Sequence, residues 1–142
     1  MAEYTEQAQE IVDAFNEVPV SSKLELLLEY ANALPALPER YADHPELLER
    51  VEECQSPVYL FVEVSDNKAN IFLTAPAEAP TTRGFASILQ LALDGQSLET
   101  IKTFSDQFIQ DLKLSDLVSP LRICGMHGML TRIKRQVQEK SL

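Results

Sequence analysis

Apolar residues recur at the helical period in the first third of the chain. Across residues 5–18 they stand three and four positions apart, which predicts an amphipathic helix. A leucine-rich segment over residues 22–34, opened by serine and closed by proline, predicts a second helix. Prolines then interrupt residues 35–50, so we expect a connection there, with a short helical turn at residues 44–49.

The pattern next changes to that of a β-hairpin. Residues 58–64 and 69–74 are rich in β-branched and aromatic side chains, and the turn sequence Ser65-Asp66-Asn67 lies between them. Residues 75–82 hold two prolines without any periodic pattern and predict a loop. Residues 84–93 are almost all apolar, which predicts a helix that is buried on most sides.

The last third of the chain has a helical pattern. Residues 97–102 and 105–112 predict two short helices, each opened by a serine at the cap position. Ser119-Pro120 predicts the start of a longer helix, because serine suits the N-cap and proline the first helical position. We expect this last helix to run to about Glu139. Helices around one small antiparallel sheet make the expected fold class α+β.

Length and composition fit one globular domain over residues 1–142, with its core at about 5–139. A chain of 142 residues matches the usual domain size of about 100–200 residues. Hydrophobic residues make up 45% of the chain and charged residues 24%, which is ordinary globular composition. The net charge of -10 argues against nucleic acid and against an anionic membrane surface as partners.

Targeting and redox signals point to the cytoplasm. No apolar run approaches the roughly 18–20 residues that span a bilayer. Residues 1–10 carry three glutamates without lysine or arginine, so we expect no signal or transit peptide. Two cysteines do not make a disulfide framework, and reduced thiols in a cytoplasmic protein are the expectation.

Cys54 stands in a polar, turn-forming segment directly before the first predicted strand. A thiol in such a loop is expected to be reachable by solvent, and its thiolate would be the reactive form. Glu52 and Glu53 would raise the pKa of the thiol if they lie close to it. The local sequence leaves a functional and an incidental cysteine equally open.

Cys124 lies in the first turns of the last predicted helix, beside Arg122. Both the helix N-terminus and the arginine would lower the pKa of its thiol. Cysteine is nevertheless among the most buried residue types, so a packing role is favoured. Cys124 and His127 are three positions apart, but one such pair is a weak zinc signal. The four glycines form no phosphate-binding loop, and the chain has no G-x-S-x-G elbow.

Four motifs occur in an order that resembles the SufE family, the sulfur-acceptor partners of PLP-dependent cysteine desulfurases. The resemblance covers about residues 15–137 and implies an α+β fold like that of the iron–sulfur scaffold proteins. The motifs are Leu-Pro-Ala-Leu-Pro-Glu at 34–39, Glu-Cys-Gln-Ser-Pro-Val-Tyr-Leu at 53–60, Arg-Gly-Phe-Ala at 83–86 and Leu-Val-Ser-Pro-Leu-Arg-Ile-Cys-Gly-Met at 117–126.

The resemblance implies a role for Cys54. In the family the loop cysteine takes sulfane sulfur from the persulfide of the desulfurase, stimulates that enzyme and passes the sulfur on for iron–sulfur cluster assembly. This implies a persulfide carrier that is not an independent enzyme and binds no cofactor of its own. The partner desulfurase carries the PLP, and an iron–sulfur scaffold complex is the expected second partner.

The remaining candidate residues also follow from the resemblance. Glu53, Gln55 and Ser56 belong to the cysteine loop, whereas Arg83 and Arg122 are expected at the loop or at the partner interface. Three positions depart from the family pattern, which usually has glycine at the place of Glu53, lysine at that of Arg83 and a polar residue at that of Cys124. Cys124 could therefore resolve the Cys54 persulfide or form a disulfide with Cys54.

Two other function classes stay open at the level of sequence. An iron–sulfur scaffold or metal-binding module would need three or four converging Cys, His or Asp ligands. A cysteine hydrolase or thiol oxidoreductase would need a histidine base, for which His127 is a candidate, or a C-x-x-C pair. Neither requirement is evident along the chain.

Overall fold

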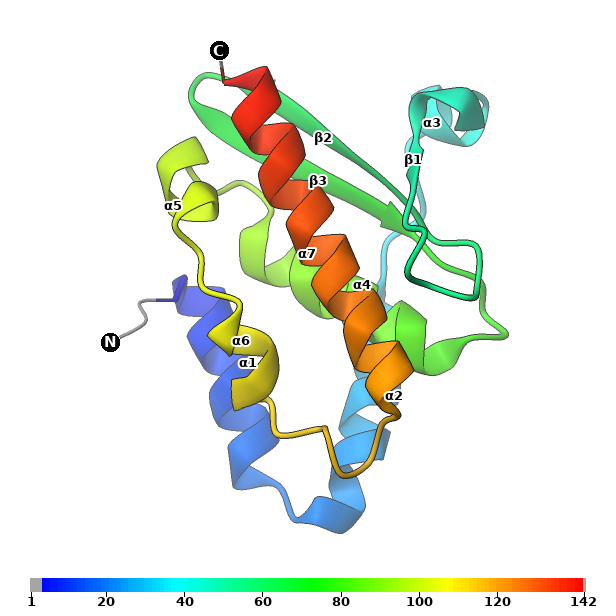
Figure 1. Ribbon diagram of the computed structural model, residues 1–142, viewed down its shortest axis with the longest axis vertical. Helices are drawn as coiled ribbons and strands as arrows, with labels where there is room; N and C mark the ends of the chain where they lie inside the picture. Colours follow the sequence, from blue (N-terminus) through cyan, green and yellow to red (C-terminus); the bar gives the residue numbers. More distant parts are fainter. Residues whose placement is uncertain (1–3, 142) are drawn as a thin grey trace.

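A three-stranded antiparallel sheet with the order β1-β2-β3 positions the rest of the fold (Figure 1). The computed structural model describes residues 4–141. The strands are β1 (Glu49–Arg50), β2 (Tyr59–Ser65) and β3 (Lys68–Thr74). β2 and β3 form the predicted hairpin, and helices pack around this small sheet. The predicted α+β class is therefore confirmed.

Alternation along β2 and β3 builds the inner face of the sheet. Leu60 pairs with Leu73 and Val62 pairs with Ile71, and all four side chains are buried. The turn at Asp66-Asn67 has φ angles of 54° and 63°, the left-handed conformation that a tight hairpin turn requires and that Asp and Asn tolerate.

Two long helices contact each other and cover the sheet. They are α4 (Pro80–Leu93), which packs mainly on β3, and α7 (Pro120–Lys140), which packs mainly on β2. The Ser119 side chain accepts a hydrogen bond from the Arg122 amide at 3.3 Å, so α7 starts at the predicted cap.

The N-terminal helices pack against α4. They are α1 (Glu6–Glu17) and α2 (Lys23–Ala33), joined through a 3₁₀ turn at Val20–Ser22. Two short helices, α5 (Leu98–Lys102) and α6 (Gln107–Asp111), lead to α7. These four helices match the predicted segments within a few residues. Within residues 4–141, no helix has both the length and the apolar character that crossing a bilayer requires.

Two parts of the structure differ from the sequence-based prediction. The connection after α2 has the predicted short helical turn, as a 3₁₀ turn at Pro45–Leu47, but it also contains α3 (Glu39–Ala42) and the strand β1, which were not predicted. A two-residue strand has no periodicity to detect, and it forms because β2 supplies its pairing partner. The predicted loop over residues 75–82 is also too long, because α4 begins at Pro80, a residue that suits the first helical position.

Gly84 sets how closely α4 approaches α2. A Cβ at this position would lie 2.7 Å from both the backbone oxygen and Cδ1 of Leu27. The backbone oxygen cannot move aside without shifting α2, so any larger residue overpacks the contact. The neighbouring Arg83 spans the same junction, donating from Nε to the Ala31 oxygen (3.0 Å) and from Nη1 to the Ala75 oxygen (2.6 Å).

We therefore expect Gly84→Ala to lower the free energy of unfolding by about 2 kcal/mol and the melting temperature by about 5 °C. Leu91→Ala serves as the control, because Leu91 lies in the same helix with 47% of its surface exposed. That substitution should cost less than about 0.5 kcal/mol. Thermal and denaturant unfolding followed by circular dichroism measures both, and equal losses would contradict the close-contact explanation.

Candidate functional site

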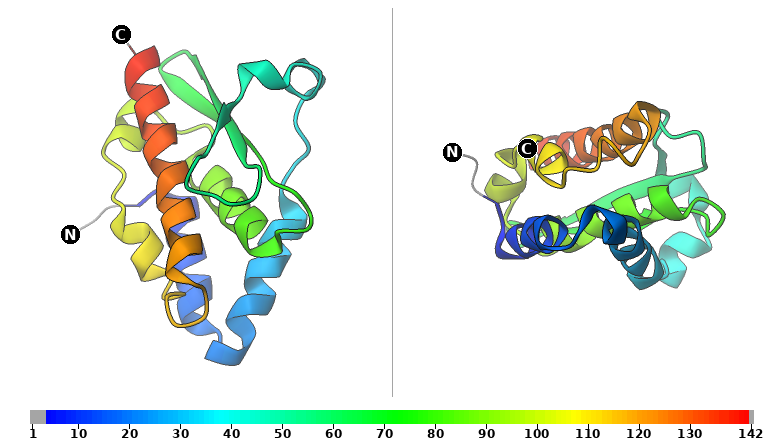
Figure 2. Two further views of the ribbon diagram at one scale, coloured as in Figure 1. Left: turned by 45° about the vertical axis from the view of Figure 1, so that its right-hand side comes forward. Right: turned by 90° about the horizontal axis from the view of Figure 1, so that it is seen from below.

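The loop that carries Cys54 lies directly against α7. Both views of Figure 2 show this loop, between β1 and β2, beside the N-terminal half of α7. Its ends are joined by a hydrogen bond from the Val51 amide to the Val58 oxygen (2.9 Å), and the Cys54 amide donates to the Val51 oxygen (3.1 Å). The sheet thus fixes the base of the loop, and a turn presents the cysteine to the helix.

Two glycines of α7 make room for the loop. A Cβ at Gly125 would lie 2.9 Å from the Cys54 Sγ, and a Cβ at Gly128 would lie 2.7 Å from the Glu53 carboxyl carbon. The two glycines are three positions apart and therefore share one face of the helix. We call this glycine pair the α7 notch.

An ion pair holds the loop in the α7 notch. Arg132 lies one turn beyond Gly128, and its Nη1 donates to the Glu53 Oε1 at 2.5 Å. The Arg132 Nε lies 3.3 Å from a carboxylate oxygen of Glu49, within ion-pair distance but without hydrogen-bond geometry. Only 16% of the Arg132 side chain is exposed, so water screens this pair less than a surface ion pair.

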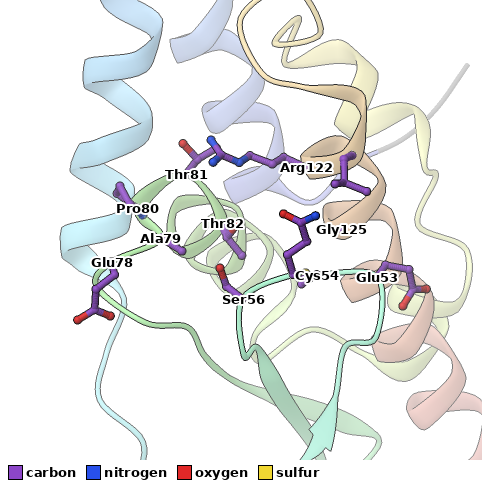
Figure 3. Close-up of a pocket in the computed structure, with 12 residues that line it drawn as sticks. Glu53, Cys54, Ser56, Glu78, Ala79, Pro80, Thr81, Thr82, Arg122 and Gly125 are labelled. Atoms are coloured by element: carbon purple, nitrogen blue, oxygen red, sulfur yellow. The ribbon is translucent and has the colours of Figure 1, made fainter.

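Cys54 faces a pocket of about 280 Å³ (Figure 3). Three segments form its wall: the cysteine loop, the start of α4 and the first turns of α7. The lining residues are Glu53, Cys54, Gln55, Ser56, Glu78, Ala79, Pro80, Thr81, Thr82, Leu121, Arg122 and Gly125. The pocket gives a small group direct access to the side of the loop that carries the thiol.

Burial controls the protonation of Cys54. The residue is 7% exposed, and loss of hydration raises the pKa of its thiol to about 11. The negative charge of Glu53 raises it further, as the sequence predicted, whereas Arg132 acts in the opposite direction. The resting thiol is therefore protonated at neutral pH and is a poor nucleophile.

The settings of the two cysteines are the reverse of those expected. The prediction that the Cys54 thiol is reachable by solvent is wrong, because the loop packs into the α7 notch and Cys54 is buried. The packing role favoured for Cys124 is also wrong, because Cys124 is exposed. Consecutive residues of a helix point about 100° apart, so Gly125 faces the loop and Cys124 does not. Both thiols are free, and the idea of a Cys54–Cys124 disulfide stays a hypothesis.

The structure brings most of the predicted site residues together. Glu53, Gln55, Ser56 and Arg122 line the pocket with Cys54. Arg83 does not, because its guanidinium binds the carbonyls of Ala31 and Ala75 described above.

Sequence reasoning missed several residues of the site. The pair Gly125 and Gly128 could have been recognised from its helical spacing. Arg132 could not, because its partner Glu53 lies 79 positions away in the sequence. Thr81 and Thr82 were placed in a loop and instead open α4.

Neither His44 nor His127 lines the pocket. His127 lies outside the pocket wall, and His44 contacts Glu46 at 3.0 Å on the surface. Over the part of the chain that the structure describes, no three His, Cys, Asp or Glu side chains are grouped so that they could hold a metal ion.

Comparison with known proteins finds relatives over nearly the whole chain. The family model described as "SufE: Fe-S metabolism associated domain" matches residues 9–137. An "Uncharacterized SufE-like protein" of Mycobacterium tuberculosis is 51% identical over 131 residues, which are 92% of this chain and 90% of the relative. The SufE-like protein 1, chloroplastic/mitochondrial, of Arabidopsis thaliana is 28% identical over 129 residues, which are 90% of this chain but 34% of the relative.

A solved structure shares the fold. The solution structure of a hypothetical protein from Thermus thermophilus matches with a TM-score of 0.83 and 30% identity. The match covers 96% of this chain and 97% of the other.

The charge beside Cys54 predicts how its reactivity changes on substitution. Glu53→Gln removes the negative charge that raises the Cys54 pKa and leaves Arg132 to lower it, so the pKa falls. Below the pKa the alkylation rate follows the thiolate fraction, so we expect iodoacetamide to modify Cys54 about 3- to 10-fold faster at pH 8. The rate is measured against pH in a Cys124→Ser background.

Glu52→Gln is the matched control. Glu52 is the preceding residue and is exposed, and it is not among the causes of the Cys54 pKa shift. Its variant should keep the parent rate. An equal acceleration in both variants would show that loop loosening, rather than the Glu53 charge, governs the thiol.

Proposed function

Because the chain belongs to the SufE family, we propose that it is a sulfur-transfer accessory protein whose Cys54 accepts sulfur from a PLP-dependent cysteine desulfurase. The family is associated with Fe–S metabolism, and a sulfur-transfer role in that metabolism follows from membership. The family resemblance noted in the sequence is confirmed by the match over residues 9–137. The observation that carries the finer proposal is a loop cysteine facing a pocket, in the motif that defines the resemblance.

The transfer conserves atoms and electrons without an external oxidant or reductant. The sulfur of Cys54 attacks the terminal sulfur of the donor persulfide and forms a new S–S bond. The S–S bond of the donor breaks, and its electron pair stays on the donor cysteine, which takes up the Cys54 proton. A protonated thiol becomes a bound persulfide anion, and the donor persulfide anion becomes a thiol.

Burial makes the transfer conditional on the partner. A thiol that is 7% exposed and protonated reacts slowly with molecules in bulk solution. Transfer requires the donor persulfide to enter the pocket or the loop to leave the α7 notch. The Glu53–Arg132 ion pair and the close contact at Gly125 oppose the second movement. This arrangement favours a protein donor that docks over small thiols.

The proposed partners follow from this reaction. The desulfurase supplies the persulfide and carries the PLP, and an iron–sulfur scaffold complex receives the sulfur. Cys54 acts as a carrier and activator in half of a sulfur-transfer reaction, so we do not propose an independent enzyme. The reaction needs a reduced thiol, and we therefore propose the cytoplasm as the compartment. No contact among residues 4–141 specifically favours the scaffold, metal-binding or cysteine-hydrolase alternatives.

We expect Cys54→Ser to abolish both sulfur acceptance and stimulation of the desulfurase. After incubation with a cysteine desulfurase and cysteine, the peptide that holds Cys54 should gain about 32 Da, the mass of one sulfur atom. Desulfurase turnover measured without reductant should rise with the parent chain and not with Cys54→Ser.

Cys124→Ser provides the matched control, because it removes the exposed thiol and leaves the pocket intact. This variant should accept sulfur and stimulate as the parent does. Sulfur found on Cys124, or stimulation retained by Cys54→Ser, would refute the assignment of Cys54.

A further inference from the structure

The pocket beside Cys54 is lined by an uncapped helix N-terminus. The residue before α4 is Ala79, and no side chain of residues 4–141 caps the helix. Pro80 has no amide hydrogen, whereas the amides of Thr81 and Thr82 belong to the first turn, where a helix offers donors without intrahelical acceptors. Both threonines line the pocket. The start of α4 thus directs two backbone donors and the positive end of a 14-residue helix dipole to this space.

The Thr82 hydroxyl offers the pocket a hydrogen-bonding group that no residue of the described chain uses. Thr82 is 9% exposed and lines the pocket, and no hydrogen bond of its hydroxyl is found within the described chain. The hydroxyl oxygen is not among the fully enclosed unpartnered atoms of the described residues, so it is open to the pocket. Figure 3 shows Thr82 in the wall of the pocket, near Cys54 and Ser56. An unpartnered hydroxyl that faces an open pocket is suited to a ligand that accepts a hydrogen bond.

Arg122 adds a positive charge across the pocket. It projects from the first turn of α7, and Figure 3 shows its side chain reaching over the pocket toward Thr81. No carboxylate among residues 4–141 lies within ion-pair distance of it. Two acidic residues also line the pocket, but the Glu53 carboxylate is paired with Arg132 and the Glu78 carboxylate points away from Cys54. The start of α4 and Arg122 therefore supply hydrogen-bond donors to the space in front of the thiol.

We propose that this pocket is an anion site that holds the terminal sulfur of a Cys54 persulfide, with Thr82, the first amides of α4 and Arg122 as its donors. This inference rests on the proposed function and extends it to the residues that keep the cargo. An S–S bond is about 2.05 Å long, so the added sulfur would lie about that far from the Cys54 Sγ. In the proposed site it lies on the pocket side of the loop. A pocket of about 280 Å³ accommodates that atom and the tip of an approaching cysteine side chain.

The two sulfur atoms of the loaded protein thus meet different surroundings. The inner sulfur, the Sγ of Cys54, stays in the α7 notch, where burial disfavours a negative charge on it. The outer sulfur, the terminal atom of the persulfide, meets the hydrogen-bond donors of the pocket, which favour its negative charge. A hydropersulfide is also a stronger acid than a thiol, so the loaded protein carries an anion where the unloaded protein carries a neutral thiol. Thiolates in solution attack a persulfide anion slowly because like charges repel, so the site protects the sulfur until a partner docks.

Chemical loading tests the anion site without any desulfurase. Purified protein in a Cys124→Ser background is treated with inorganic polysulfide, and the Cys54 persulfide is alkylated with iodoacetamide over a range of pH and quantified by mass spectrometry. Thr82→Val has nearly the shape of threonine and lacks the hydroxyl. Loss of the Thr82 hydroxyl should raise the pH midpoint of persulfide alkylation by about one unit, which is the effect of one hydrogen bond to a charged group. The half-life of the persulfide in millimolar glutathione should fall several-fold.

Three further variants make the test specific. Thr82→Ser keeps the hydroxyl and should restore the parent midpoint. Arg122→Gln alters an exposed residue, so it should fold normally and should raise the midpoint as Thr82→Val does. Thr103→Val, at the end of α5 and outside the pocket wall, should leave the midpoint unchanged.

The outcomes separate the anion site from the proposed function. Unchanged midpoints in both Thr82→Val and Arg122→Gln would overturn the anion site, and so would the absence of any persulfide on Cys54 after polysulfide treatment. If the pH midpoints of persulfide alkylation rise in these variants but a cysteine desulfurase does not load the parent protein with sulfur, the anion site is supported and the proposed sulfur donor is refuted.

Discussion

The close contact between the cysteine loop and α7 determines the properties of the whole site. Gly125 and Gly128 give α7 a notch without side chains, and the loop places Cys54 and Glu53 in it. The same contact requires α7 to be held in a fixed position against the sheet. Gln136 provides this by accepting from the Val62 amide at 2.9 Å and donating to Glu49 at 2.8 Å, which joins the helix to both β1 and β2. Loop, sheet and helix therefore form one unit in which a shift of α7 would move the thiol.

This contact also sets the reactivity of the thiol. Desolvation is the largest cause of the raised Cys54 pKa, and desolvation exists only while the loop lies in the α7 notch. Glu53 has two effects, because its charge raises the pKa of Cys54 and its ion pair with Arg132 keeps the loop in place. Both effects suppress the thiolate in the resting state, and a movement that separates Glu53 from Arg132 would expose the thiol to solvent. The reactivity of the thiol and the position of the loop are thus coupled through the Glu53 carboxylate.

Local sequence signals predicted much of the fold and little of the site geometry. Periodicity, caps and turn residues identified the hairpin and the helices, because each of these is encoded within about a dozen neighbouring residues. The strand β1 and the helix α3 were missed because they are too short to show a period and depend on contacts with β2. The local polarity around Cys54 indicated an exposed thiol, yet its burial depends on α7, some 70 residues further along the chain. Family resemblance directed attention to the Cys54 loop. Only the three-dimensional contacts show that Glu53 binds Arg132 and that Arg83 binds backbone carbonyls instead of lining the pocket.

The uneven distribution of polarity around Cys54 would allow an acidic protein to hold the proposed anionic persulfide. The net charge of -10 would by itself disfavour a second sulfur with negative charge. At about 0.1 M salt, interactions between charges are screened over about 10 Å, so the nearest groups decide. At the pocket these include the start of α4, Thr82 and Arg122, beside a Glu53 carboxylate that is paired with Arg132. Across the loop, the Cys54 Sγ meets Gly125 and lies next to the Glu53 carboxylate, and burial together with that charge keeps the thiol protonated. On the side of the α7 notch the thiol is thus kept neutral. On the pocket side, the proposed donors would stabilise the negative charge that sulfur loading creates. In the proposed site, a partner that disturbs either the start of α4 or Arg122 would weaken the hold on the outer sulfur.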